Sequence, residues 1–138
     1  MKNNFKIILG ILIITSITSC SKDITGSKIA LANQMIADKV WYLDYKQTST
    51  GLKSYIGAST FYVKYLKDLT YQDSDGLTGT YSVEMVNNQL QIHVQQKTSN
   101  GNSVESVLNI EQIGDNNLNV SFTPIGATSK TIQYFSAK

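Results

Sequence analysis

From Trp41 to Phe135 the chain repeatedly alternates apolar and polar residues with a period of two, and short polar segments interrupt the alternation. Such alternation sends successive side chains to opposite faces of an extended chain, so it predicts half-buried β-strands. The clearest example is Leu90-Gln91-Ile92-His93-Val94-Gln95. About eight strands are expected, at residues 41–46, 60–65, 69–71, 77–85, 90–95, 104–110, 118–122 and 131–135.

The segments between these strands are typical of turns, for example Asp73-Ser74-Asp75-Gly76 and Asn87-Asn88. They are too short for the crossovers that parallel strands need, so we expect antiparallel strands that pair in chain order. The predicted fold is therefore all-β, an antiparallel up-and-down barrel of about eight strands, which leaves no exposed strand edge. A two-sheet β-sandwich is the alternative. One short amphipathic helix is expected at residues 29–37, packed on the sheet or over a barrel mouth.

The first nineteen residues predict a secretory signal peptide. Lys2 and Lys6 precede an apolar stretch at residues 7–17, which is too short to span a bilayer and ends in small residues. The following Ile17-Thr18-Ser19-Cys20 resembles the lipobox of bacterial lipoproteins. This resemblance implies cleavage before Cys20 and modification of Cys20 by acyl chains such as palmitate, which would anchor the protein in a membrane.

Residues 20–28 are polar and aperiodic, and we interpret them as a lipidated tether before a domain at 29–138. Ser21-Lys22-Asp23 resembles the short surface-export signal of lipoproteins in the Bacteroidetes, which implies an outer-membrane or cell-surface location. An ordinary solvated tether is an equally acceptable interpretation of these residues.

Charge argues against a nucleic-acid partner. All twelve basic residues are lysines, and two of them lie in the signal peptide, so ten lysines balance the ten acidic residues of the remaining chain. A neutral domain without arginine cannot neutralise many phosphates, and it lacks the planar donor that grips them. The single cysteine also excludes an intrachain disulfide.

Residues 29–138 resemble the lipocalin-like lipoproteins of the Bacteroidetes. The resemblance is carried by a rhythm of strands in five segments: Lys39-Val40-Trp41-Tyr42-Leu43, Gly79-Thr80-Tyr81-Ser82-Val83, Asn88-Gln89-Leu90-Gln91-Ile92, Leu118-Asn119-Val120-Ser121 and Gln133-Tyr134-Phe135. It implies a lipocalin-like barrel. The chain departs from lipocalins proper because Lys39 occupies their glycine position before the tryptophan, and because the late arginine is absent.

Six aromatic residues fall on predicted inward faces. We expect them to fill a small barrel, and a hollow barrel that holds one small ligand is the alternative. The candidate barrel-lining residues are Trp41, Tyr45, Phe61, Tyr65, Tyr81 and Phe122. Tyr42 and Tyr62 are expected to face outward.

No motif in the sequence indicates catalysis. His93, the only histidine, is expected on the solvent face between Gln91 and Gln95, and it cannot form a multi-histidine metal site. The segment at residues 73–76 lacks the spacing of a calcium loop, which favours a hairpin turn. We therefore expect neither a metal nor a cofactor.

These observations predict a non-enzymatic envelope lipoprotein that binds a small apolar ligand or another envelope component. The alternative is a protein–protein interaction module, or an inhibitor, on the cell surface. The deciding property is the interior of the barrel, because a cavity of a few hundred cubic ångströms favours ligand binding.

Overall fold

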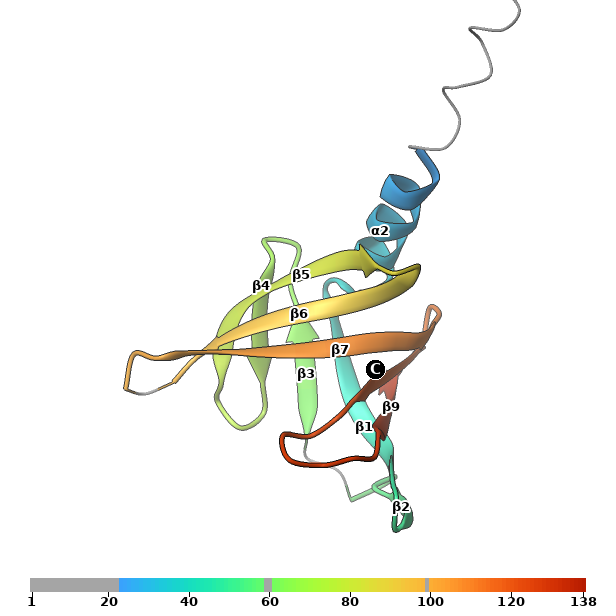
Figure 1. The fold of residues 1–138 in the computed structure, drawn as a ribbon, viewed down its shortest axis with the longest axis vertical. Coiled ribbons are helices and arrows are strands. Elements are labelled where there is room, and N and C mark those ends of the chain that lie inside the picture. Colours follow the sequence, from blue (N-terminus) through green and yellow to red (C-terminus); the bar gives the residue numbers. More distant parts are fainter. Residues whose placement is uncertain (1–22, 59–60, 99) are drawn as a thin grey trace, which may run out of the picture.

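The structure is a computed structural model that describes residues 23–58, 61–98 and 100–138. It contains one helix followed by antiparallel strands (Figure 1). The elements are α2 (Asp23–Ile36), β1 (Lys39–Thr48), β2 (Gly51–Ser54), β3 (Tyr62–Tyr65), β4 (Thr70–Asp73), β5 (Thr78–Val86), β6 (Gln89–Lys97), β7 (Ser103–Ile113), β8 (Asn117–Phe122) and β9 (Thr131–Ala137).

The strands close into a barrel, as the alternation predicts. Strands β3 to β9 pair in chain order, and β1 pairs with β3 on one side and with β9 on the other. Strand β2 pairs only with the far half of β1, so it extends the barrel wall as a hairpin. The remaining eight described strands form the closed barrel, which replaces the sandwich alternative.

Strand β2 was not expected from the sequence. Gly51-Leu52-Lys53-Ser54 is short and all four residues are exposed, so it has no alternation between a buried and an exposed face. Its pairing with β1 follows instead from the tight turn that connects the two strands.

Local chemistry sets the hairpins. At the β5–β6 turn, Asn87 and Asn88 both have positive φ, 50° and 63°, which matches the two-residue turns that suit twisted hairpins. At the β4–β5 turn, the Asp73 carboxylate accepts hydrogen bonds from the backbone N–H groups of Asp75 and Leu77, both at 3.0 Å. This segment is therefore the hairpin turn that we expected.

Gly79 lies where β5 and β6 approach most closely. A β-carbon built at this position would overlap the backbone carbonyl of Gln95 on the paired strand. Glycine at this position therefore permits the close approach of the backbone of β6.

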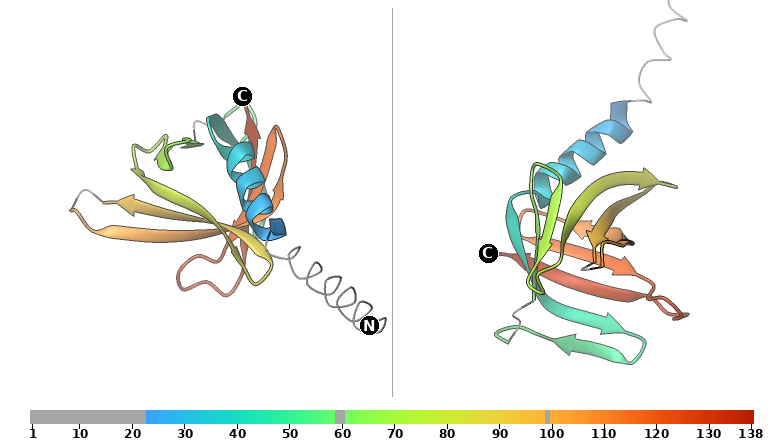
Figure 2. Two further views of the ribbon diagram at one scale, coloured as in Figure 1. Left: turned by 90° about the horizontal axis from the view of Figure 1, so that it is seen from above. Right: turned by 90° about the vertical axis from the view of Figure 1, so that its left-hand side faces the viewer.

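Helix α2 covers one end of the barrel beside β5 (Figure 2). Ala32 and Ile36 on its inner face are buried, and the carbonyl of Ile36 accepts a 2.9 Å hydrogen bond from the indole N–H of Trp41. Trp41 itself is fully buried at the start of β1. The helix thus closes this end and satisfies the one polar atom of the tryptophan.

The helix begins earlier than the sequence predicts. It starts at Asp23, so the segment 23–28 that we interpreted as an aperiodic tether is helical. Its described side chains, from Ile24 to Lys28, are exposed and do not contribute to the core. Packing of Ala32 and Ile36 fixes the last turns of the helix against the barrel, and extending this helix toward its N-terminus requires no new nucleation.

Cys20 and the expected signal peptide at residues 1–19 lie outside the described residues. Within the described part of the chain, no helix is both long enough and apolar enough to cross a membrane.

Candidate ligand-binding pocket

Two strand halves of the barrel wall have a neighbour on one side only. Residues 82–86 of β5 pair with β6 but not with β4, and helix α2 packs against this strand. Residues 103–108 of β7 pair with β6, whereas the pairing of β7 with β8 begins only at Asn109 and Ser121. The chain between β8 and β9, residues 123–130, lies beside this second gap.

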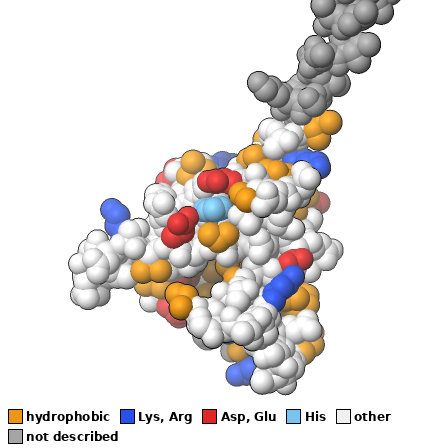
Figure 3. Space-filling model, viewed as in Figure 1, with side chains coloured by type: hydrophobic (Ala, Val, Ile, Leu, Met, Phe, Trp, Pro, Cys, Tyr) orange, Lys and Arg blue, Asp and Glu red, His pale blue; other side chains and the backbone are white. Residues whose placement is uncertain are grey.

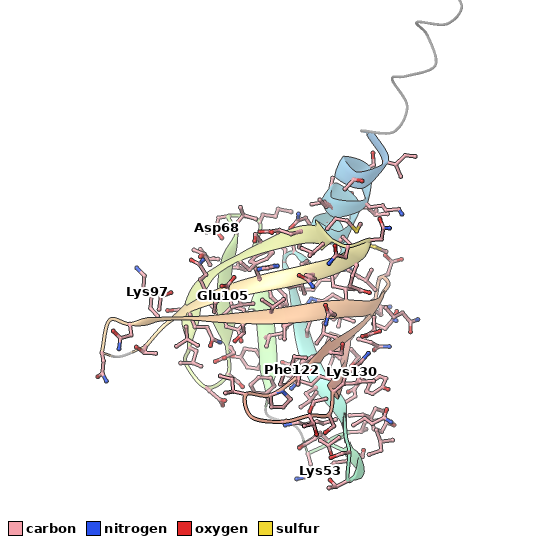
Figure 4. All side chains as sticks on the ribbon, viewed as in Figure 1. Lys53, Asp68, Lys97, Glu105, Phe122 and Lys130 are labelled. Atoms are coloured by element: carbon pink, nitrogen blue, oxygen red, sulfur yellow. The ribbon has the colours of Figure 1, made fainter. Side chains whose placement is uncertain are left out.

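A pocket of about 360 Å³ opens at the gap between β7 and the β8–β9 loop. In Figure 3 it appears as a hollow bordered by hydrophobic side chains, and Phe122 and Lys130 mark the two ends of the loop in Figure 4. It opens at the end of the barrel opposite to α2, where β6, β8 and β9 contribute residues toward their ends farthest from the helix, and it extends inward along β3 from Phe61 to Tyr65.

The pocket walls are mainly apolar and aromatic. Seven lining residues belong to the hydrophobic core or pack against it: Phe61, Val63, Tyr65, Tyr71, Val94, Leu108 and Phe135. Phe122 and Pro124 add further apolar surface to the pocket. A cavity of this size, with apolar walls and few polar groups, has the general character of small-molecule sites.

The six predicted barrel-lining residues separate into three groups. Phe61, Tyr65 and Phe122 line the pocket. Trp41 and Tyr81 are buried in the filled part of the core, nearer the helix. Side chains therefore fill the barrel only at its helix end, and the expectation of a completely filled interior is wrong for the opposite end.

Tyr45 does not line the interior. The register of β1 against β9 shifts between Leu43 and Tyr45, and Tyr45 pairs with Tyr134, the neighbour of inward-facing Phe135. The two tyrosine rings lie edge to face, 6.4 Å apart, in a separate depression with Gln47 and Leu52. The β-bulge reverses the side on which Tyr45 emerges, and strict alternation along the sequence does not predict such an insertion.

Four polar side chains that line the pocket make no hydrogen bond with another side chain or backbone group of the described chain: Tyr65, Ser106, Thr123 and Gln133. Tyr65 is only 2% exposed, and burial raises the pKa of its hydroxyl far above the ordinary tyrosine value. The group therefore stays protonated and neutral. Ser106 and Gln133 are half-buried on the same inner face, opposite Val94 and Val120 respectively.

Tyr71 has its own partner inside the barrel. Its hydroxyl donates a 2.9 Å hydrogen bond to the buried carboxylate of Asp73. Burial is the main cause that raises the pKa of Tyr71 above the ordinary tyrosine value, and neighbouring Tyr65 and the Asp73 carboxylate add to it. Asp73 is fully engaged, because it also accepts the two turn N–H groups.

Among the described residues that line the pocket, Glu105 is the only acidic one and none is a lysine. The Glu105 carboxylate lies on the outer face of β7, where one oxygen is 3.1 Å from Nδ1 of His93. The interior of the pocket is therefore uncharged.

His93 is half-buried on the outer face of β6, as the alternation predicts, but it has partners that the sequence did not reveal. Its Nε2 is 3.1 Å from the amide oxygen of Gln91 and 4.0 Å from a carboxylate oxygen of Glu84 on β5. The two glutamates reach His93 from the neighbouring strands on either side, so only the strand register brings them together. Among the described residues, no three acidic, histidine or cysteine side chains form a group that could hold a metal ion.

The far end of the β8–β9 loop is fixed by a charged contact. Nζ of Lys130 lies 2.6 Å from a carboxylate oxygen of Glu111, which also accepts a 2.5 Å hydrogen bond from the hydroxyl of buried Ser121. Lys130 and then Ser121 hold the pKa of Glu111 below its ordinary value. This contact ties the loop to β7 at one edge of the pocket.

Sequence reasoning missed Ser106, Gln133 and the loop residue Ile125, which lines the pocket and is fully exposed. The alternation of β7 and β9 places Ser106 and Gln133 inward, and this signal was present in the sequence. No local signal distinguishes Ile125 from other loop residues.

The sequence matches neither a protein-family model nor a curated protein. The character of the site therefore rests on the geometry described above.

Proposed function

We propose that this protein is a non-enzymatic lipoprotein of the cell envelope whose barrel binds a small, largely apolar ligand. The observation that carries the proposal is the pocket of about 360 Å³ at the barrel end opposite to α2. It meets the size criterion for a ligand site, and its walls offer aromatic and aliphatic surface that a small apolar molecule can cover.

The lipoprotein part of the proposal comes from the sequence before the barrel. The Ile17-Thr18-Ser19-Cys20 motif supports anchoring at Cys20, and the charge balance of the remaining chain gives no reason to invoke a nucleic acid. Intact mass of the membrane-extracted protein should show a chain that begins at Cys20 and carries a diacylglyceryl group. A soluble, unmodified wild-type product would contradict anchoring without touching the pocket.

The pocket is tested by filling it. A chain that begins at Cys20 retains helix α2 and every strand that forms the core, so we expect it to fold. This chain should enhance the fluorescence of N-phenylnaphthylamine, an uncharged apolar probe. Leu108→Trp places a large ring on the pocket wall and should abolish the enhancement.

Gln95→Trp is the matched control. It adds the same ring on the exposed outer face of the neighbouring strand β6, away from this pocket. Melting curves should show that both variants are folded. Equal probe binding by wild type and Leu108→Trp, or no binding by a folded wild type, would contradict ligand binding in the barrel.

A protein–protein interaction module or inhibitor is the second candidate. The pocket rim favours it, because Val104 and Val107 on the partly unpaired β7 and Ile125 on the loop are exposed. Exposed apolar side chains beside a free strand edge are typical of surfaces that bind other chains. Under this alternative, Val104→Ser and Ile125→Ser would remove partner binding, whereas Leu108→Trp would preserve it.

A further inference from the structure

The hydroxyl of Tyr65 is available to a ligand in the pocket. Tyrosine hydroxyls inside proteins normally find a hydrogen-bond partner. Tyr65 is only 2% exposed as a residue and lines the pocket, its hydroxyl oxygen is not among the fully buried polar atoms, and it makes no hydrogen bond with the described residues. Neighbouring Tyr71 and Tyr81 both have partners, the Asp73 carboxylate and the backbone carbonyl of Leu66. Only Tyr65 of the three is left with a free donor.

The other polar groups of the pocket are also neutral. The Ser106 hydroxyl and the Gln133 amide both donate and accept hydrogen bonds, and neither carries a charge. Together with Tyr65 they provide hydrogen-bonding capacity that the protein itself does not use.

The charged side chains nearest the pocket are not among the groups that a ligand would contact, or already have partners. The buried Asp73 carboxylate accepts hydrogen bonds from Tyr71 and from two backbone N–H groups of the turn. Glu105 interacts with His93 on the outer face. Lys46 pairs with Gln133 and therefore lies on the same face of the sheet, but it is not among the residues that line this pocket and instead lines a depression between β1 and β2 together with Lys53. A carboxylate, phosphate or ammonium group inside the pocket would therefore lose its hydration without gaining an ionic partner, which is costly.

Resting on the ligand-binding function proposed above, we infer that the pocket selects an uncharged amphiphile, whose apolar body lies against the aromatic walls and whose hydroxyl or carbonyl oxygen accepts a hydrogen bond from Tyr65. The aromatic walls are supplied by Phe61, Tyr71, Phe122 and Phe135. Ser106 and Gln133 offer further hydrogen bonds to the polar group of the ligand.

Three ligands that share one hydrocarbon chain test the selection for charge: decanol, decanoate and decylamine. Each ligand is titrated into the chain that begins at Cys20 with N-phenylnaphthylamine bound, and displacement of the probe measures the affinity of the ligand. The titrations are done at neutral pH and below the concentration at which micelles form. We expect decanol to bind at least about tenfold more tightly than decanoate or decylamine, because either charge would be buried without a partner. Equal or tighter binding of decanoate or decylamine would overturn the inference.

The Tyr65→Phe variant tests the hydrogen bond. It removes only the unpaired oxygen, so the fold is retained, and the affinity for decanol should fall about fivefold, as for loss of one neutral hydrogen bond. Tyr81→Phe, whose hydroxyl is outside the pocket and engaged with Leu66, should change decanol binding by less than about twofold. Unchanged decanol binding in Tyr65→Phe would exclude Tyr65 as the donor.

A third variant reverses the preference. Ser106→Lys places a positive charge on the pocket wall and should make decanoate bind more tightly than decanol. If Ser106→Lys prefers decanol over decanoate to the same extent as wild type does, the absence of charge in the pocket is not the cause of the selection. In all these experiments, probe binding by wild type reports the proposed function separately, and its absence from a folded protein would overturn that function and not merely the ligand class.

Discussion

The two ends of the barrel are built from the same strands but have different interiors. At one end, Ile36 and Trp41 are fully buried, together with Ile92 and Leu118 from β6 and β8. At the other end, Phe61 and Phe122 are only partly buried and border a pocket. The difference follows from what covers the unpaired half of a strand, which is a helix at β5 and an irregular loop at β7. Stability is therefore concentrated at the helix end, and binding capacity at the loop end.

The largest difference in unfolding free energy between the two ends should come from replacing one aromatic residue at each end by alanine. Trp41→Ala removes a fully buried ring and its hydrogen bond to Ile36, which should cost about 3–5 kcal/mol of unfolding free energy. Phe122→Ala, on the pocket wall, should cost less than about 2 kcal/mol because its ring is already partly exposed. Chemical denaturation measures both values, and equal losses would show that the two ends are equally well packed.

The elements that cover the two gaps provide a second comparison. Ile36→Ala on the helix should cost about 2–5 kcal/mol, because the side chain is completely buried. Ile125→Ala on the loop should change the unfolding free energy by no more than about 0.5 kcal/mol, because that side chain is fully exposed. A large loss for Ile125→Ala would mean that the loop is as firmly packed as the helix.

Alkaline pH should destabilise the folded chain through two tyrosines in the barrel interior, Tyr65 and Tyr71. Burial raises the folded-state pKa of Tyr65 and Tyr71, so above the ordinary tyrosine value of 10.0 the folded chain holds protons that the unfolded chain releases. The contribution of these two protonated hydroxyls to the unfolding free energy is therefore fully present below about pH 10, and it is lost as the pH rises beyond that value. In a pH series of thermal melts, Tyr65→Phe should make this loss of stability with pH shallower, because only Tyr71 of the two still titrates in it. The same slope in wild type and Tyr65→Phe would remove Tyr65 as a cause.

The smallest effect is expected on the outer face, away from both ends. His93→Gln removes the contacts with Glu84 and Glu105, which are more than half exposed, and should change stability by no more than about 0.5 kcal/mol. Ligand affinity should stay within a few fold. Turnover by the wild-type chain that His93→Gln abolishes would contradict the non-enzymatic proposal.

The sequence was sufficient to predict the barrel because period-two alternation and turn residues are local signals. The positions of Trp41, Tyr65 and Tyr81 inside the barrel follow directly from that alternation. The bulge that turns Tyr45 outward was not accessible in the same way, because it arises where β1 pairs with the distant strand β9. The short strand β2 is local, but its four exposed residues carry no alternation that would predict a strand.

The pocket itself could be predicted only in part. Phe61 and Phe122 were assigned correctly to the inner face, but whether inward side chains meet or leave a hollow depends on where β8 stops pairing with β7. That boundary is a property of the three-dimensional path of the β8–β9 loop. The glutamates beside His93 were missed for the same reason, since they lie on other strands.

Helix α2 leads away from the barrel on the side remote from the pocket, and its first residue, Asp23, follows Cys20 by only three positions (Figure 1). If acyl chains hold Cys20 at a bilayer, the helix lies between the bilayer and the barrel, and the opening of the pocket faces the water. A guest molecule would then have to be captured from the aqueous side, so the pocket would compete with the bilayer for a sparingly soluble compound instead of drawing it sideways out of the lipid.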